Sequence, residues 1–512
     1  MLEIRLPQLS LDAVLEHRNI TPEWLNASKS DFLPTSLMKN AEAAADFIKE
    51  NINKKWGILI DADADGITSS AIALVALERL GATNVQLIKF EGKVHGIDGK
   101  TDLLPEVDVL LIPDAATNDV EDCKTLAEKG VKVLICDHHE QEVENPYALI
   151  VNPHQKGCEY PNKGLSGGTV TWKVFSQLVN LDDYLDLCAI STVGDRMPLS
   201  SLENIAFTRE GLANLRNPFL LAHFAADRRL DGKSLDAMLV GWYLAPLINA
   251  GVRMGTSEDV IEIVEAMAGK VDGHEAVDRL LKLRGQQNRK IDMAVPTIVL
   301  KTVDDANIVM AIRPPSLPKT TTGLVCNRLV GHYGKPVLLG SIVDGYYSGS
   351  ARNIDNASFG LKETLAATGL MDFVAGHSNA HGFGIKEEDI PKLKEALSAL
   401  NVSEKKITVD GFLNNMPQDE IIPFLFAVHE LAGWFECDIP EFSLGLAVDD
   451  NFTSFTTMKD RHCKAKWNGV DLVQFGTTEP FKKGEMLIVK TSINSWQGRD
   501  MMQLMVSDRV TV

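Results

Sequence analysis

The stretch GVKVLICDHHE, residues 130–140, places an aspartate and two adjacent histidines directly after a run of apolar residues. Its apolar part, residues 133–136, is short, largely β-branched and preceded by a Lys-Gly turn signal, which is typical of a buried parallel strand. Polar residues after such a strand lie at its carboxyl end, where open α/β sheets bind ligands. Two interpretations remain open at this point: a metal or phosphate site, or a hydrophilic loop that ends the strand.

The chain around this stretch alternates strand-like runs with amphipathic helical segments. The runs are WGILID (56–61), NVQLIKF (84–90), VDVLLIPDA (107–115) and VKVLICD (131–137). This alternation predicts an α/β fold with a parallel sheet and crossover helices. Beyond it we expect a helical connector, a smaller α/β domain and a small C-terminal β-barrel of short strands. The predicted boundaries are 1–50 for a lead-in, then 51–200, 201–304, 305–402 and 403–512.

The composition, with 45% hydrophobic and 24% charged residues, is typical of a globular protein. The length of 512 residues indicates several domains. We expect no membrane span and no signal peptide, because no apolar run is long enough and the start lacks a basic region followed by an apolar one. Seven scattered cysteines without a C-x-x-C pair predict reduced thiols in a cytoplasmic protein. No dimerisation heptad is evident, so we expect a monomer.

Charge is unevenly distributed along the chain, whose net charge is −19. Residues 401–460 contain eleven acidic and three basic side chains, whereas residues 461–512 contain five acidic and eight basic ones. An acidic protein is a poor nucleic-acid binder overall, but local charge matters more in a multidomain chain. The balance is compatible with one basic groove on an acidic body.

Carboxylates and histidines follow the ends of several predicted elements. LIDADADG, LIPDA, ICDHHE and STVGD supply Asp61, Asp63, Asp65, Asp114, Asp137, His138, His139 and Asp195. Because the carboxyl ends of parallel strands meet at one sheet edge, we expect these side chains to form one pocket. The DxDxDG run also resembles a calcium loop, but Ile72 stands where an EF-hand has its glutamate.

So many carboxylates cannot all ionise together without cations, because like charges a few ångströms apart repel strongly. Oxygen-rich ligation with one or two imidazoles suits Mn²⁺ or Mg²⁺, and nitrogen ligands favour manganese. Two divalent ions roughly 3.5–4 Å apart are a known device for displacement at phosphorus. We therefore predict two divalent metal ions as cofactors.

The four motifs, in this order, resemble those of the DHH phosphoesterase superfamily, and residues 50–512 are similar to its RecJ family of single-strand-specific 5′→3′ exonucleases. The resemblance implies that Asp63 and Asp114 hold one metal, that Asp65, Asp114, His138 and Asp195 hold the other, and that Asp114 bridges both. It also implies that His139 contacts the scissile phosphate and that Asp137 orients a histidine. Relatives with H-x-x-x-D-x-D have a histidine where this chain has Leu59, and Asp61 is the candidate to replace it.

The residues that select the substrate are expected downstream. AGHSNAHGFGI resembles the phosphate-binding motif of the associated DHHA1 domain, with His377 as its histidine, and GYYSGSARN resembles the segment that grips a 5′-terminal phosphate. Ser350 and Arg352 are two apart on an extended strand and so project from the same face. Arg328, near the start of a predicted helix, and Asn249 and Arg253 in LINAGVRMG match further family positions.

The C-terminal segment resembles the OB-fold of the RecJ family. Trp467 and Trp496 lie there among the basic residues Lys464, Lys466 and Arg499, and aromatic faces with nearby cations are typical of single-strand binding. Packing of each tryptophan in the barrel core is the alternative. The sequence therefore predicts contact with DNA by this domain.

The resemblance implies a metal-dependent exonuclease that degrades single-stranded DNA 5′→3′ to 5′-mononucleotides by attack of an activated water, in DNA repair or recombination. Candidate protein partners are a single-strand-binding protein or a helicase. The alternatives are a phosphodiesterase of short oligonucleotides or cyclic dinucleotides, a pyrophosphatase, and an inactive single-strand-binding scaffold. Intact motif residues argue against the scaffold, and the OB-like tail is unexplained by the small-substrate enzymes.

Overall fold

The computed structural model describes residues 2–213, 215–230, 233–302, 307–354, 357, 359–398, 407–458, 461–496 and 499–511, without the side chains of residues 2, 495, 496, 499 and 511. The chain forms two compact units. The larger unit contains residues 4–252, 256–278 and 408–512, and the smaller one contains residues 1–3, 253–255 and 279–407.

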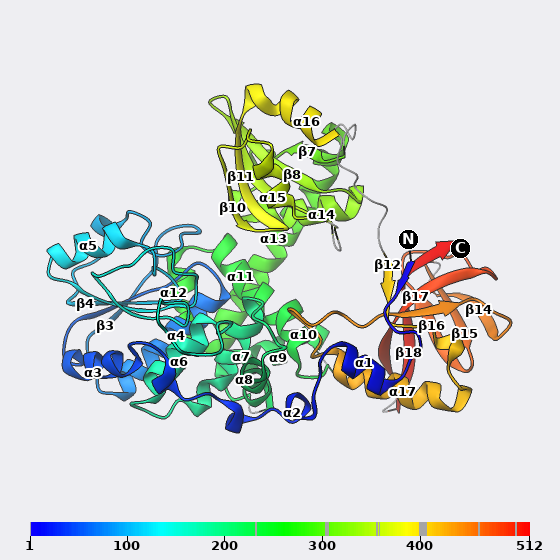
Figure 1. The fold of residues 1–512 in the computed structure, drawn as a ribbon, viewed down its shortest axis with the longest axis horizontal. Helices are drawn as coiled ribbons and strands as arrows, with labels where there is room; N and C mark the ends of the chain where they lie inside the picture. Colours follow the sequence, from blue (N-terminus) through cyan, green and yellow to red (C-terminus); the bar gives the residue numbers. More distant parts are fainter. Residues whose placement is uncertain are drawn as a thin grey trace. The chain divides into compact units, whose positions relative to one another are not determined.

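The larger unit is built on a five-stranded parallel sheet, which confirms the predicted α/β fold (Figure 1). Its order is β3 (Val85–Ile88), β2 (Trp56–Leu59), β4 (Val109–Pro113), β5 (Lys132–Cys136), β6 (Leu149–Val151). Every pair in the sheet is parallel. All five residues of β4 are buried, as expected of a strand covered on both faces.

Helices cover both faces of this sheet. Helix α5 (Val120–Glu128) packs Cys123 and Leu126 against Leu110 and Ile112 of β4 on one face. Four further helices belong to the same domain: α3 (Ala41–Asn51), α4 (Ala64–Arg79), α6 (Gly167–Ser176) and α7 (Leu185–Gly194). Figure 1 shows α5 above the sheet and α3 and α6 below it.

Helices dominate residues 201–302, in agreement with the predicted connector. They are α8 (Leu202–Ala213), α9 (Pro218–Ala226), α10 (Ala237–Leu239), a π-helix (Val240–Leu244), α11 (Ala245–Met254), α12 (Ser257–Met267) and α13 (Gly273–Lys301). The lead-in contributes β1 (Leu2–Ile4), α1 (Leu11–His17) and α2 (Pro22–Leu25). Short 3₁₀ turns occur at Lys29–Asp31, Thr35–Leu37, Thr101–Leu103, Asp182–Tyr184, Arg228–Leu230, Lys319–Thr321, Glu387–Asp389 and Leu413–Asn415.

The smaller unit contains a five-stranded mixed sheet with helices. The strand order is β10 (Phe373–His377), β11 (Ala380–Lys386), β9 (Tyr346–Arg352), β8 (Val337–Val343), β7 (Val309–Ile312). Only the β7–β8 pair is parallel among these described strands. Apolar clusters that draw on its strands and on α14 (Thr322–Tyr333), α15 (Leu361–Ala367) and α16 (Ile390–Ser398) form its core.

The C-terminal part of the larger unit is a six-stranded sheet. Its strand order is β13 (Leu444–Ala447), β17 (Glu485–Trp496), β18 (Arg499–Thr511), β16 (Val470–Gln474), β15 (His462–Trp467), β14 (Phe452–Met458). Two elements precede this sheet in the sequence, β12 (Ile407–Val409) and α17 (Gln418–Ala432). Only β16 and β18 pair in parallel within the described strands. Across the described residues no pair joins the edge strands β13 and β14, so the predicted closed barrel is not confirmed.

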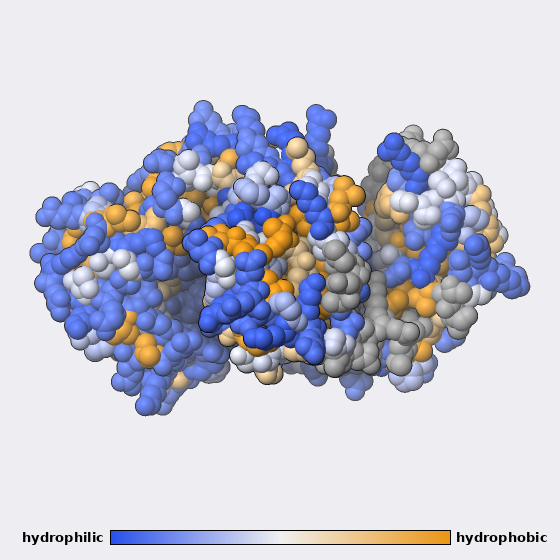
Figure 2. Space-filling model, turned by 90° about the horizontal axis from the view of Figure 1, so that it is seen from above, coloured by the Kyte–Doolittle hydropathy of each residue, from blue (hydrophilic) through white to orange (hydrophobic). Residues whose placement is uncertain are grey.

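Hydrophilic side chains cover most of the face seen in Figure 2. Across the described residues, no helix is both long and apolar enough to cross a membrane. All seven cysteines are free and five of them are buried. The predicted domain boundaries themselves stay predictions.

Candidate functional site

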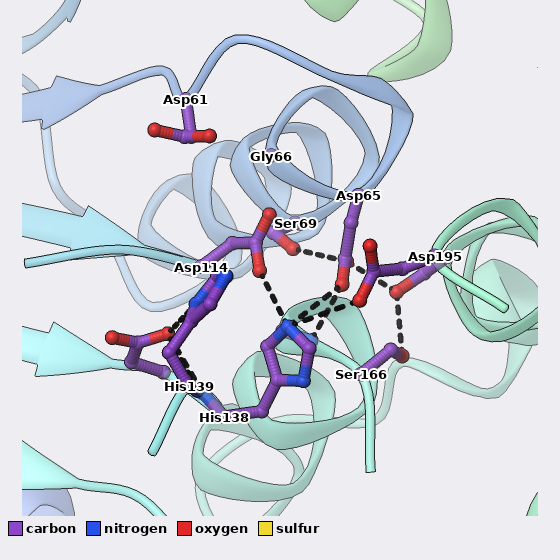
Figure 3. A network of polar contacts seen from close by, with 12 residues as sticks. Asp61, Asp65, Gly66, Ser69, Asp114, His138, His139, Ser166 and Asp195 are labelled. Atoms are coloured by element: carbon purple, nitrogen blue, oxygen red, sulfur yellow. Dashed lines mark hydrogen bonds and ion pairs between the residues drawn. The ribbon is translucent and has the colours of Figure 1, made fainter. Parts of the chain in front are cut away.

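Polar side chains from four elements gather at the carboxyl edge of the parallel sheet (Figure 3). Asp114 follows β4, His138 follows β5, Asp65 lies in the first turn of α4, and Asp195 is the residue after α7. His138 is the centre of this group. Its Nε2 atom lies 3.1 Å from Asp114 Oδ1, 3.4 Å from Asp195 Oδ2 and 3.7 Å from Asp65 Oδ2.

Asp65 is held rigidly by the start of α6. The backbone N–H groups of Gly167 and Gly168 donate to its two carboxylate oxygens at 2.8 Å each, and the hydroxyl of Ser191 donates to Oδ1. A helix N-terminus favours a carboxylate because its backbone N–H groups are unpaired and its dipole is positive there. The sequence contains the signal for this contact, the glycines of LSGGTV (165–170), but we assigned them no role.

Asp114 occupies an unusual backbone conformation. Its φ of 67° lies in the left-handed region, and that of Ala116 is 75°. Such conformations cost free energy for residues other than glycine and concentrate at functional sites. The backbone N–H of Asp114 donates to the Cys136 carbonyl at 2.8 Å, so the end of β5 fixes the turn that presents the carboxylate.

The electrostatics of the cluster disfavour ionised carboxylates. Burial, reinforced by repulsion from Asp65 and Asp63, raises the pKa of Asp195 to about 8. The same causes raise the pKa of Asp114 well above its ordinary range. Burial also lowers the pKa of His138, so its imidazole is held neutral, the form that binds metals.

Asp137 positions the second histidine of the motif. Its Oδ1 atom accepts a hydrogen bond from Nδ1 of His139 at 2.8 Å and from the backbone N–H of His138 at 2.7 Å, and Oδ2 accepts from the N–H of Thr117. Although burial opposes ionisation of Asp137, these contacts keep its pKa low. The hydrogen bond from His139 to Asp137 raises the pKa of His139 to about 9. His139 is therefore a half-exposed cation at neutral pH.

Asp61 and Asp63 form a neighbouring group with a histidine that sequence reasoning missed. Asp63 precedes α4 and caps it, because its Oδ1 atom accepts from the N–H groups of Asp65 and Gly66. Asp61 is buried and contacts His95, whose Nδ1 atom lies 2.7 Å from Asp61 Oδ2. In Figure 3, Asp61 stands apart from the group around His138.

The donors of both groups fit divalent metal ions. Three sets of residues bring their ligand atoms, one from each residue, within 4.8 Å of one another. The sets are Asp65, His138 and Asp195; Asp114, Asp137, His138 and His139; and Asp61, Asp63 and His95. Asp114 Oδ1 and His138 Nε2 are buried and face each other at 3.1 Å, but neither atom forms a hydrogen bond with any described residue. Buried polar atoms are normally paired, so a bound cation is the natural partner of these two.

Known proteins resemble this chain in sequence. Residues 55–192 match the DHH family, N-terminal domain. The chain is 30% identical over 443 residues to the provisionally named SPbeta prophage-derived single-strand DNA-specific exonuclease YorK of Bacillus subtilis (strain 168), an alignment that covers 78% of this chain and 76% of YorK. It is also 30% identical over 412 residues to the single-stranded-DNA-specific exonuclease RecJ of the same strain, covering 76% of this chain and 51% of that protein.

The fold matches solved structures too. The crystal structure of RecJ from Thermus thermophilus with Mn²⁺ aligns over 99% of this chain and 79% of that one, at a TM-score of 0.77 and 22% identity. RecJ from the same organism with Mg²⁺ aligns at a TM-score of 0.70, with 22% identity over 99% of this chain and 78% of that one.

The chain belongs to the RecJ family of the DHH superfamily.

Among the other residues predicted from the RecJ family, Ser350 and Arg352 lie on a strand as expected, whereas Arg328 does not lie where it was expected. Ser350 and Arg352 are on β9, and His377 is the exposed last residue of β10. Asn249 and Arg253 are on α11. Arg328 lies nearly two turns into α14, not near its start as predicted, and its guanidinium is 3.9 Å from Asp292.

Trp467 corrects the prediction for the C-terminal domain. Its side chain is 1% exposed, so it packs in the core of the sheet and cannot stack a base. Lys464 and Lys466, on the other face of β15, both pair with Asp471 at 2.8 and 3.2 Å. Phe455 and Phe475 are exposed aromatic side chains that sequence reasoning missed here, 43% and 57% exposed. The side chains of Trp496 and Arg499 lie outside the described part of the chain.

Gly167 offers a first test of how tightly this RecJ-family site is built. A Cβ atom there would lie 2.5 Å from Oδ1 of Asp114, so Gly167→Ala must displace that carboxylate. We expect the variant to bind Mn²⁺ at least about tenfold more weakly in calorimetric titration, because misplaced ligands lose affinity. Gly285→Ala is the control, since a Cβ at Gly285 meets open space. Equal Mn²⁺ affinity in both variants would contradict a rigid contact between α6 and Asp114.

Proposed function

We propose that the protein is a metal-dependent exonuclease that degrades single-stranded DNA from the 5′ end to 5′-mononucleotides, in DNA repair or recombination. The observation that carries the proposal is the convergence of Asp65, Asp114, His138 and Asp195 at one sheet edge, with buried polar atoms that have no hydrogen-bond partner among the described residues. Membership of the RecJ family supports the substrate class, since YorK and RecJ are named as single-strand DNA-specific exonucleases.

The residues divide between ligands and a phosphate contact. Asp63 and Asp114 would hold one divalent ion, with Asp61 beside them, and Asp65, Asp114, His138 and Asp195 would hold the other. Bound there, Mn²⁺ or Mg²⁺ would supply a water nucleophile at neutral pH and charge stabilisation at phosphorus. His139, kept charged and oriented by Asp137, would contact an oxygen of the scissile phosphate. The bond between phosphorus and the 3′ oxygen of the terminal nucleotide breaks as water adds to phosphorus.

The smaller unit would bind the DNA strand through its phosphates. Arg352 lies against the first turn of α14, because a Cβ atom on Gly323 would come within 2.4 Å of its Nη2 atom. A guanidinium beside the N–H groups of a helix N-terminus forms a site of positive potential suited to a terminal phosphate. Ser350 on the same strand and His377 on β10 are the further phosphate contacts that we propose for this unit, with Arg328 and Arg253 as weaker candidates.

The test is digestion of a long single-stranded DNA labelled at either end, with Mn²⁺, with Mg²⁺ and with chelator. We expect metal-dependent release of the 5′ label as mononucleotide, with duplex DNA spared. Release from the 3′ end first would overturn the direction. Turnover of dinucleotides without cleavage of the long strand would place the protein among small phosphodiesterases, and DNA binding without cleavage in either metal would make it a scaffold.

A further inference from the structure

The loop that follows β3 carries a histidine to the edge of the metal centre. The backbone N–H of Gly96 donates to Asp61 Oδ1 at 2.9 Å, and the N–H of Ile97 donates to Asp119 Oδ2 at 2.8 Å. Gly96 has a φ of 61° and is packed against Asp119, and Ile97 is fully buried. The loop is therefore anchored immediately after His95, and the position of this residue is fixed by the fold.

The imidazole of His95 faces two carboxylates. Its Nδ1 atom lies 2.7 Å from Asp61 Oδ2, and atoms of His95, Asp61 and Asp63 all lie within 4.8 Å of one another. At 2.7 Å the ring nitrogen and the carboxylate oxygen share a proton, and a metal ion that binds both atoms would take the place of that proton. Asp61 is 3% exposed, whereas the side chain of His95 is 52% exposed, so the group is open to solvent on the histidine side.

Strand β2 supplies no imidazole for this position. Leu59, which stands where some DHH proteins have a ligating histidine, is 1% exposed and belongs to the apolar cluster beneath α5. Asp63 has already committed its Oδ1 atom to the cap of α4. A first metal bound only by Asp61, Asp63 and Asp114 would have carboxylate ligands alone, while His95 lies within reach.

We propose that His95 is the imidazole ligand of the metal ion held by Asp61 and Asp63. The proposal rests on the proposed function, because it assigns one more ligand to that metal centre. It implies that each of the two ions has one nitrogen ligand, from His95 and from His138. Nitrogen ligation favours Mn²⁺ over Mg²⁺, so His95 also sets the metal preference of the first site.

The experiment counts Mn²⁺ ions on the full chain by electron paramagnetic resonance, without DNA. Wild type is expected to bind two ions, each showing coupling to an imidazole nitrogen. In His95→Ala we expect one site to weaken about 10–100-fold and to lose its nitrogen coupling, with the other unchanged. His95→Gln, which keeps the size of the side chain, should lose the same coupling. His274→Ala, at an exposed histidine of the same unit, is the control and should match wild type.

Equal affinities and equal nitrogen coupling in wild type and His95→Ala would overturn the proposal. The same outcome would leave the proposed function intact, since cleavage of single-stranded DNA is measured separately. Conversely, a wild type that binds two Mn²⁺ ions but does not cleave the strand would defeat the proposed function alone. A further variant, His95→Asp, tests the metal preference. It should still bind two ions, but the affinity of the first site should shift from Mn²⁺ toward Mg²⁺.

Discussion

Replacing Asp114 by asparagine is expected to reduce cleavage of single-stranded DNA at least about a thousandfold while leaving DNA binding intact. Asp114 lies between the two ligand groups, and its Oδ1 atom is one of the buried atoms without a hydrogen bond to any described residue. An amide keeps the shape but removes the charge that two cations would share. Asparagine also adopts the left-handed backbone at φ 67° at a lower cost in free energy than alanine. The measurement is the initial rate of mononucleotide release, with filter binding of the same strand.

The melting temperature of this variant shows whether it loses activity because a metal ligand is missing or because the protein unfolds. Burial and the neighbouring aspartates raise the pKa of Asp114, so the ionised carboxylate destabilises the metal-free protein at neutral pH. Asp114→Asn should then melt at or above the temperature of wild type in chelator. Asp46→Asn, which changes an exposed aspartate on α3, is the matched control and should cleave normally. Turnover by Asp114→Asn close to wild type would reject Asp114 as a bridging ligand.

The parallel sheet and its cluster could be predicted because they depend on short, local patterns. The motif aspartates and histidines follow apolar runs or a helix end. Because the carboxyl ends of parallel strands meet at one edge of a sheet, these positions predict that the side chains lie close together. The contacts that hold the cluster could not be predicted in this way. Asp65 receives its hydrogen bonds from Gly167 and Gly168, about a hundred residues further along the chain, and only the folded chain brings these elements together.

His95 illustrates the limit more sharply. It lies in a loop without periodic pattern, and its position depends on Asp61 and Asp119, which accept hydrogen bonds from the two residues that follow it. A lone histidine in such a loop carries no signal in one sequence. The structure is needed to see that its ring faces two carboxylates.

Trp467 shows the opposite case, in which the pattern was readable. Residues 462–467 alternate between half-buried and buried, so Cys463, Ala465 and Trp467 share the buried face, whereas Lys464 and Lys466 share the other. Because side chains of a strand alternate, a base-stacking tryptophan would have to share the face of the lysines. The alternation of apolar and basic residues along this strand therefore indicates a core tryptophan from the sequence alone.

Removing divalent metal is expected to abolish cleavage and to make the melting temperature fall as pH rises from about 6.5 to 8. The folded-state pKa of Asp195 is raised from 3.8 to about 8, so its contribution to stability is complete at acid pH and is lost as pH rises through about 8. Asp63 and Asp114, whose pKa values are also raised by burial, act in the same direction. Burial lowers the pKa of His138, so this residue makes stability rise with pH, but only below its ordinary pKa near 6.5. Above pH 6.5 that opposing effect is gone, and the melting temperature should fall most steeply there.

Thermal melts in chelator should therefore show a drop on the order of 5 °C or more across this interval. Adding Mn²⁺ should flatten the curve, because cations stabilise the ionised carboxylates that repel one another in their absence. Asp195→Asn in chelator isolates the local cause, since it removes the group with the shift to about 8 and should lose a large part of the slope. A melting temperature in chelator that stays level or rises between pH 6.5 and 8 would mean that the ionised carboxylates of the cluster do not destabilise the fold. The electrostatic argument for bound cations at this sheet edge would then be wrong.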